Sequence, residues 1–373
     1  MTIISSVKSI IRGLSLFIIL AGVIQSQSAW GQDSGQPSGK ETDFQFSFVP
    51  GMSTTDSYST SHFSFNIIGG YNGAFHGFEL GSVFNGNRYD VSGFQLSGVI
   101  NMNGQQSRGA IISGAVNITG SFSGGILSSG AININRQEAK GVLLSGGINI
   151  VGGFSKGLMS AGGMNLAEHA GGVSLAPLNI AEEHTGLQIG VLNIADRQEG
   201  TQIGVINVSG KGEGAPIGLL SFVEDGRFNV DVWSSETGFV NGGIRLGTEA
   251  IYNVIGAGYN PFYGDNLWQV AYGIGYYQDI GNKGNGMETD LMYYQVNYDG
   301  KWTEETSMHI QWRFHYTHAF TEGTGLFTGP SLNLYLADEE LSDSHIPYTI
   351  YDHSSGSTRL RWWAGWTLGL ELF

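Results

Sequence analysis

Residues 125–156 read GILSSGAININRQEAK and then GVLLSGGINIVGGFSK, so the second sixteen residues repeat the pattern of the first. In each copy an Asn stands between two aliphatic residues, as in Ile132-Asn133-Ile134, and a Gly lies three residues before that Asn. Such a triplet indicates a β-strand, because alternate side chains leave opposite faces. The polar run at 136–140, RQEAK, indicates a solvated turn between strands.

The repeat extends in both directions from this stretch. Its period is 16 residues up to Asn165 and 14 residues after it, and Ser221 occupies the step that follows Asn207. Units this short cannot bury a core alone and must stack on their neighbours. We predict that the central Asn residues of the units form a structural ladder, which comprises Asn101, Asn117, Asn133, Asn149, Asn165, Asn179, Asn193 and Asn207.

Two architectures fit the repeat. Each unit can be one coil of a β-solenoid, with Gly at a tight corner and equivalent Asn residues about 4.8 Å apart. Alternatively, each unit is one strand of an antiparallel meander that closes into one large barrel. Bacterial barrels usually have short turns at one end and long loops at the other, whereas all turns of this repeat look alike. We therefore predict a solenoid and keep the large meander barrel as the alternative.

The region after Phe228 changes to long strands in which aromatic and aliphatic residues alternate with small or polar ones. Between Met308 and His318, the even positions are apolar and the odd positions are polar. This alternation is typical of an outer-membrane β-barrel, whose apolar face contacts lipid. The residues that we predict to be polar groups of the barrel lumen are Gln311, Arg313, His315, Arg359 and Arg361.

These patterns divide the chain into five segments. Residues 1–31 have cations before an apolar run and small residues at a cleavage site, as a secretory signal peptide does. Residues 32–43 are polar and predict a flexible leader. We predict that residues 44–73 are the first barrel strands, residues 74–226 the repeat region and residues 227–373 the remaining barrel strands. The barrel then has about ten strands, with the solenoid inserted after the second.

Composition excludes several classes of function. The chain has 373 residues and no Cys, which excludes disulfides, thiolate metal sites and Cys nucleophiles. Lys and Arg total 17 against 32 Asp and Glu, so nucleic acid is not an expected partner. The segment Gly153-Phe154-Ser155-Lys156-Gly157 matches a G-x-S-x-G motif but falls in a polar turn and not between a strand and a helix. We expect no catalytic residue, no metal site and no cofactor.

Several units resemble the bacterial surface-repeat proteins. The segments that carry this resemblance are GVLLSGGINIVGG (141–153), GLQIGVLNIA (186–195), GTQIGVINVSG (200–210), IGLLSFVEDG (217–226) and FTGPSLNLYL (327–336). The resemblance covers residues 63–373 and implies a place in the cell envelope. It implies no reaction. Phe373 resembles the C-terminal aromatic residue by which barrels are recognised for insertion, although Glu371, Gly369 and Thr367 replace the apolar residues expected at alternate positions before it.

The sequence therefore predicts a non-enzymatic protein of the outer membrane or cell surface, with a structural or adhesive role. The expected partners are outer-membrane lipid and a glycan or another surface component, the glycan along an Asn-lined face of the repeats. The alternative is a porin-like channel. A barrel of about ten strands is largely filled by its own side chains, which argues against a wide pore.

Overall fold

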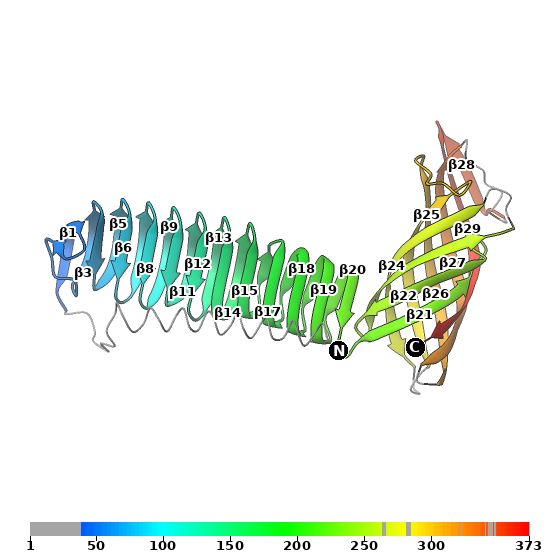
Figure 1. The fold of residues 1–373 in the computed structure, drawn as a ribbon, viewed down its shortest axis with the longest axis horizontal. Helices are drawn as coiled ribbons and strands as arrows, with labels where there is room; N and C mark the ends of the chain where they lie inside the picture. The colour runs from blue at the N-terminus through cyan, green and yellow to red at the C-terminus, as the bar shows by residue number, and fades with distance from the viewer. Residues whose placement is uncertain are drawn as a thin grey trace. The chain divides into compact units, whose positions relative to one another are not determined.

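The computed structural model describes residues 39–262, 266–280, 285–321, 323–339, 341, 346 and 348–372. All regular secondary structure in these residues is β-strand, so the all-β prediction is confirmed. No helix in this part of the chain is long and apolar enough to cross a bilayer. The chain forms two compact units, residues 1–210 and 211–373. The first contains a stack of short strands and the second a closed barrel (Figure 1).

The stacked strands form a β-solenoid. Asn117 pairs with Asn133 and Asn133 with Asn149, each in parallel register 16 residues apart, and Asn165 pairs in parallel with Asn179. A meander requires antiparallel neighbours, so the large-barrel alternative is wrong. The strands are β1 (Glu41–Val49), β2 (Met52–Ser53), β3 (Thr60–Asn66), β4 (Gly69–Asn72), β5 (Ala74–Gly81), β6 (Phe84–Asn87), β7 (Val91–Ser97), β8 (Ile100–Asn103), β9 (Gln106–Ser113), β10 (Val116–Thr119), β11 (Ser121–Ser129), β12 (Ile132–Asn135), β13 (Ala139–Ser145), β14 (Ile148–Ala161), β15 (Met164–Ala170), β16 (Val173–Leu175), β17 (Leu178–His184), β18 (Leu187–Gln198) and β19 (Thr201–Gly212).

Glycine allows adjacent coils to approach closely. Gly109 has a φ of +115°, a conformation that other residues rarely adopt, and a Cβ atom at this position would collide with the carbonyl oxygen of Gly93. The same backbone geometry recurs one coil later at Gly125. Because a side chain at either position would force the coils apart, these glycines are part of the stacking geometry.

The prediction that residues 44–73 belong to the barrel is wrong. Phe44 pairs in parallel with Phe63, and Phe63 with Phe78, so β1 and β3 are coils of the solenoid. The error has a physical origin: an outward solenoid face and a barrel wall both present every second residue, so alternation alone does not distinguish them. β1 also includes residues 41–43 of the predicted leader. The predicted signal peptide and residues 32–38 of the leader lie outside the described residues.

The barrel has eight antiparallel strands, all after residue 226, and not ten. β21 pairs with β29 through Val230 and Leu372, which closes the ring. A short strand, β28 (Tyr351–Ser355), pairs with the first part of β29. The eight strands of the ring are β21 (Arg227–Ser234), β22 (Val240–Gly247), β23 (Ile251–Asn260), β24 (Leu267–Asp279), β25 (Asn285–Asn297), β26 (Ser307–Thr321), β27 (Thr324–Asp338) and β29 (Thr358–Leu372).

The two rims of the barrel differ in the length of their connections. One rim, the short-turn rim, has connections at 248–250, 280–284 and 322–323. β21 begins and β29 ends at this rim. The other, the long-loop rim, has connections at 235–239, 261–266, 298–306 and 339–350 before β28.

Candidate functional site: the barrel interior and its surroundings

The barrel interior contains a buried network of ion pairs. Arg245 on β22 donates from Nη1 to Glu288 Oε2 on β25 at 2.7 Å, and its Nε contacts Asp231 on β21. All three side chains are buried. They point inward because alternate side chains of a β-strand face opposite sides, and these three lie on the side that faces the barrel interior. A buried carboxylate or guanidinium is tolerated only when paired, so these contacts hold the three strands in a defined register.

A second ion pair lies beside the first. Arg313 on β26 donates from Nη2 to Asp290 Oδ2 on β25 at 2.7 Å, and the Tyr252 hydroxyl on β23 donates to the same carboxylate. At the short-turn rim, Arg227 lies 3.1 Å from Glu288 and 3.6 Å from Glu371. Arg227, Arg245 and Arg313 therefore each contact at least one carboxylate.

Polar and aromatic side chains fill the barrel beyond these ion pairs. The ring of His309 stacks between Tyr294 and Trp363, with centroid distances of 5.1 and 5.4 Å. Trp363 is fully buried and its Nε1 donates to Glu236 Oε1 at 3.0 Å. Asn333 accepts a hydrogen bond from Gln311 Nε2 at 2.8 Å. This part of the interior is packed like a protein core.

The structure places the predicted lumen residues at two kinds of position. Gln311, Arg313, His315 and Arg361 are buried inside the barrel. Arg359 lies near the beginning of β29, where β28 is the neighbouring strand, and pairs with Asp352 while remaining about one-third exposed. Arg359 pairs with Ala337 of β27 and is the second residue of β29, so it lies at the long-loop rim and not in the filled interior that alternation predicted.

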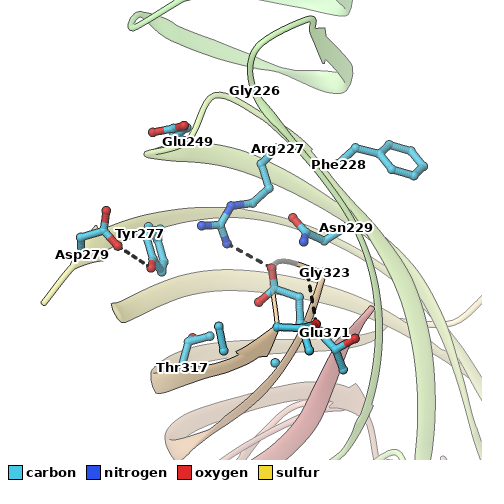
Figure 2. A pocket seen from close by; sticks show the side chains of 14 residues that line it. Gly226, Arg227, Phe228, Asn229, Glu249, Tyr277, Asp279, Thr317, Gly323 and Glu371 are labelled. Atoms are coloured by element: carbon cyan, nitrogen blue, oxygen red, sulfur yellow. Dashed lines mark hydrogen bonds and ion pairs between the residues drawn. The ribbon is translucent and has the colours of Figure 1, made fainter. Parts of the chain in front are cut away.

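A pocket of about 460 Å³ opens at the short-turn rim (Figure 2). The guanidinium of Arg227 lies 4.2 Å from the ring centroid of Tyr277, whose hydroxyl donates to Asp279 at 2.8 Å. Glu249 and Glu371 also line the pocket. Because Arg227 is already paired with Glu288 and Glu371, it offers no unmatched cation for an anionic ligand.

The predicted Asn ladder lies inside the solenoid. Asn133 Nδ2 donates to Asn149 Oδ1 at 2.9 Å and to the Leu144 carbonyl at 2.7 Å, and Asn149 repeats the first contact with Asn165 at 3.0 Å. All eight Asn side chains are buried, so their amides are hydrogen-bonded and inaccessible. A glycan cannot bind an Asn-lined face here, because the Asn residues line no outer face.

Sequence reasoning missed a buried carboxylate in the solenoid. Glu79 on β5 is fully buried and accepts hydrogen bonds from the side-chain amides of Asn66, Asn72, Asn87 and Gln95 at 2.8–3.1 Å. Burial raises the pKa of Glu79 and outweighs the effect of its amide donors. The sequence offered one indication of this site, because Glu79 is an acidic residue within a strand that has no other Asp, Glu, Lys or Arg.

Sequence reasoning also missed a polar contact on the outer wall of the barrel. Asn253 follows the inward-pointing Tyr252 and faces outward, yet it is buried, because β20 (Ala215–Val223) covers it. Asn253 Nδ2 donates to Ser221 Oγ at 2.8 Å and to the Pro216 carbonyl at 2.9 Å. Tyr272 donates to the Gly218 carbonyl at 3.0 Å. Asn253 therefore contacts the residue that occupies the next step of the Asn repeat.

The described residues contain no group of three or more His, Asp or Glu side chains placed to hold a metal ion. Ser155 of the G-x-S-x-G motif is buried within β14 and pairs with Ala139 and Ala170 on either side. It therefore does not occupy an exposed strand-to-helix turn. No family model, curated protein or solved structure matches this chain.

Proposed function

We propose that this chain is a non-enzymatic outer-membrane protein whose eight-stranded barrel anchors the repeat solenoid in the cell envelope. The observation that carries the proposal is that charged side chains lie on the inner face of the barrel wall and apolar side chains on its outer face. Arg245 and Arg313 are buried inside, whereas Trp312, Leu334 and Leu368 are exposed outside. This is the reverse of a water-soluble protein and is typical of a barrel whose wall contacts lipid.

The connections between strands support the same proposal. Outer-membrane barrels have short turns on the periplasmic side and longer loops on the outer side. This barrel has the same asymmetry, with a three-residue connection at 248–250 on one rim and a nine-residue connection at 298–306 on the other. The signal-like residues 1–31 and the resemblance to surface-repeat proteins also favour export to the envelope.

The filled interior favours a structural or adhesive role over a channel. Eight strands enclose a space just wide enough for side chains. In this barrel the space holds ion pairs such as Arg313–Asp290 and the buried indole of Trp363. Solute passage would require breaking these pairs. We therefore propose that the barrel is an anchor and that the solenoid provides the interaction surface.

Membrane fractionation, gel migration and planar-bilayer recording test this proposal. We expect the mature protein in the outer-membrane fraction and a change of migration after heating, because closed barrels resist unfolding by detergent. In planar bilayers we expect no stable large conductance. Recovery as a freely soluble periplasmic protein would refute the membrane anchor, and a stable large conductance would favour the channel instead.

A further inference from the structure

The solenoid separates charged from uncharged segments along its length. The segments 109–119, 125–135, 141–152 and 157–167 contain no Asp, Glu, Lys or Arg. Each comprises the two strands of a coil and the corner between them. The charged residues lie in the intervening turns at the opposite edge, as in 136–140. We call the corner edge with its two flanking outer faces the apolar edge of the solenoid.

The apolar edge exposes aliphatic side chains while amides are buried. Val191, at a corner, is 57% exposed, and Ile126, Leu144 and Ile189 on the flanks are also exposed. On the inner side of the same strands, Asn133 and its equivalents are fully buried. The same strands also bury aliphatic side chains such as Leu127 and Leu143, so the interior of the solenoid is mixed while its outer flanks are apolar. A continuous exposed apolar surface marks contact with a protein or membrane partner.

The backbone of the apolar edge satisfies the strictest requirement of a lipid environment. Lipid offers no hydrogen-bond partners, so backbone groups within it must pair internally. At one corner, Gly130 N–H donates to the Ser113 carbonyl at 3.2 Å, and the N–H groups of Ala131 and Ile132 both donate to the Ala115 carbonyl at 3.0 Å. The corners therefore direct their donors to the preceding coil and not to solvent.

The dimensions of the apolar edge also fit one leaflet. On one flank, Ile126 lies five positions before the corner residue Ala131, which corresponds to about 16 Å at a rise of about 3.3 Å per residue. One leaflet contributes about 15 Å, half of a hydrocarbon core of about 30 Å. The apolar edge is thus deep enough for one leaflet and too shallow to span both.

β20 carries the repeat pattern onto the outer wall of the barrel. Its residue Ser221 is buried against Asn253, whereas Leu219 and Phe222 are exposed. If the barrel spans a membrane, the outer wall that β20 covers faces lipid. The exposed residues of β20 then face lipid as well, so this strand with the repeat pattern has an apolar environment.

We propose that the apolar edge of the solenoid is embedded in one leaflet of a lipid bilayer, with its charged turns at the headgroups. The exposed aliphatic residues cover two flanks and a corner. A fluid acyl layer can cover all three surfaces, whereas a second copy of the chain would cover one flank. This inference goes beyond the proposed function, which concerns the barrel as the membrane anchor.

The absence of Cys from the chain allows a site-specific test in the full-length protein. Val191→Cys places a probe at a corner, and Glu199→Cys places the matched control in the charged turn of the same coil. Leu334→Cys, on the outward face of β27, reports separately on the barrel. Each variant is labelled with an environment-sensitive fluorophore and reconstituted into phosphatidylcholine vesicles that contain lipids spin-labelled in the middle of the acyl chain.

We expect the spin-labelled lipids to quench the probe at 191 several-fold more than the probe at 199, and aqueous iodide to quench the probe at 199 preferentially. Equal access of iodide to both positions would overturn the inference. If the probe at 334 is then still quenched by lipid, the barrel anchor survives and only the solenoid inference fails.

The same samples distinguish the remaining outcomes. Lipid quenching at 191 without quenching at 334 would support the inference and refute the barrel anchor. Shielding at 191 from both quenchers that disappears at one protein per vesicle would identify a second copy as the covering partner and overturn the inference. Shielding from both quenchers that persists at that dilution would also overturn it, because protein and not lipid would then cover the edge.

Discussion

The substitution Arg313→Gln tests whether the buried ion pairs hold the barrel together. Arg313 is 1% exposed, and its guanidinium donates to Asp290 at 2.7 Å. Gln removes the positive charge that contacts Asp290 directly, and leaves this buried carboxylate with the hydroxyl of Tyr252 as its hydrogen-bond donor and with His315 Nδ1 3.7 Å away. The alternation of polar and apolar residues alone would predict that this substitution leaves the stability unchanged, because Gln is polar and position 313 faces the interior. The contacts predict the opposite.

The expected loss of stability follows from burial. Breaking a buried ion pair by removing one partner costs about 3–5 kcal/mol, because an uncompensated charge remains. The Gln amide can still donate one hydrogen bond, which places the expected loss toward the lower end. With a urea m value of about 2 kcal/mol per molar, a loss of about 3 kcal/mol lowers the unfolding midpoint by about 1.5 M.

Urea unfolding of the refolded protein in lipid vesicles, followed by tryptophan fluorescence, measures this loss. The matched control is Arg359→Gln, because the Arg359–Asp352 pair is about one-third exposed and should contribute at most about 1 kcal/mol. The double variant Arg313→Gln/Asp290→Asn removes both charges and should recover part of the stability. Equal midpoints for Arg313→Gln and Arg359→Gln, with no recovery in the double variant, would refute the reasoning.

Three further predictions concern the wall, the buried carboxylate and the stack. Trp312→Arg places a charge on the outward face of β26 and should cost about 2–4 kcal/mol in the same vesicle assay; an unchanged midpoint would contradict lipid contact. Because burial raises the pKa of Glu79, wild-type stability should fall as pH rises from about 4.3 through that raised pKa, whereas Glu79→Gln should lack this fall. A pH-independent difference in melting temperature between these two proteins would contradict the assignment. Deletion of residues 141–156 removes one coil and should leave heat-modifiable migration intact, whereas deletion of 141–148 breaks the register and should abolish the solenoid's cooperative melting; identical behaviour of the two deletions would contradict the stack.

The sequence was most informative where one pattern recurred many times. Nine equivalent Asn positions at steps of 16 and 14 residues, from Asn85 to Asn207, predicted the coil and its inward residue. The alternation from Met308 to His318 likewise separated the buried Arg313 from the exposed Trp312. In both cases the signal is local, because one strand is enough to define which side chains share a face.

The parts that could not be predicted depend on contacts between distant strands. The alternating residues around Phe44 and Phe63 were assigned to the barrel, because the sequence of a strand does not determine which other strand pairs with it. The four amides around Glu79 come from residues spread over 66–95 and meet only when the coils stack. Asn253 has no repeat context at all, and its partner Ser221 lies 32 residues away.

The buried Asn ladder stabilises the solenoid in addition to its apolar core, which includes Phe75, Ile111 and Leu143. In a water-soluble solenoid, stability comes chiefly from apolar side chains removed from water at the centre of each coil. Here the Asn residues from Asn101 to Asn193 each bind the next Asn and a neighbouring carbonyl, as Asn193 does with Asn207 at 2.9 Å and Ile203 at 3.0 Å. Hydrogen bonds of this kind strengthen when the surrounding dielectric falls. A coil that contains both an apolar core and a hydrogen-bonded amide ladder, with further aliphatic residues on its outer flanks, therefore keeps its internal contacts when its surroundings are apolar, as the proposed lipid contact requires.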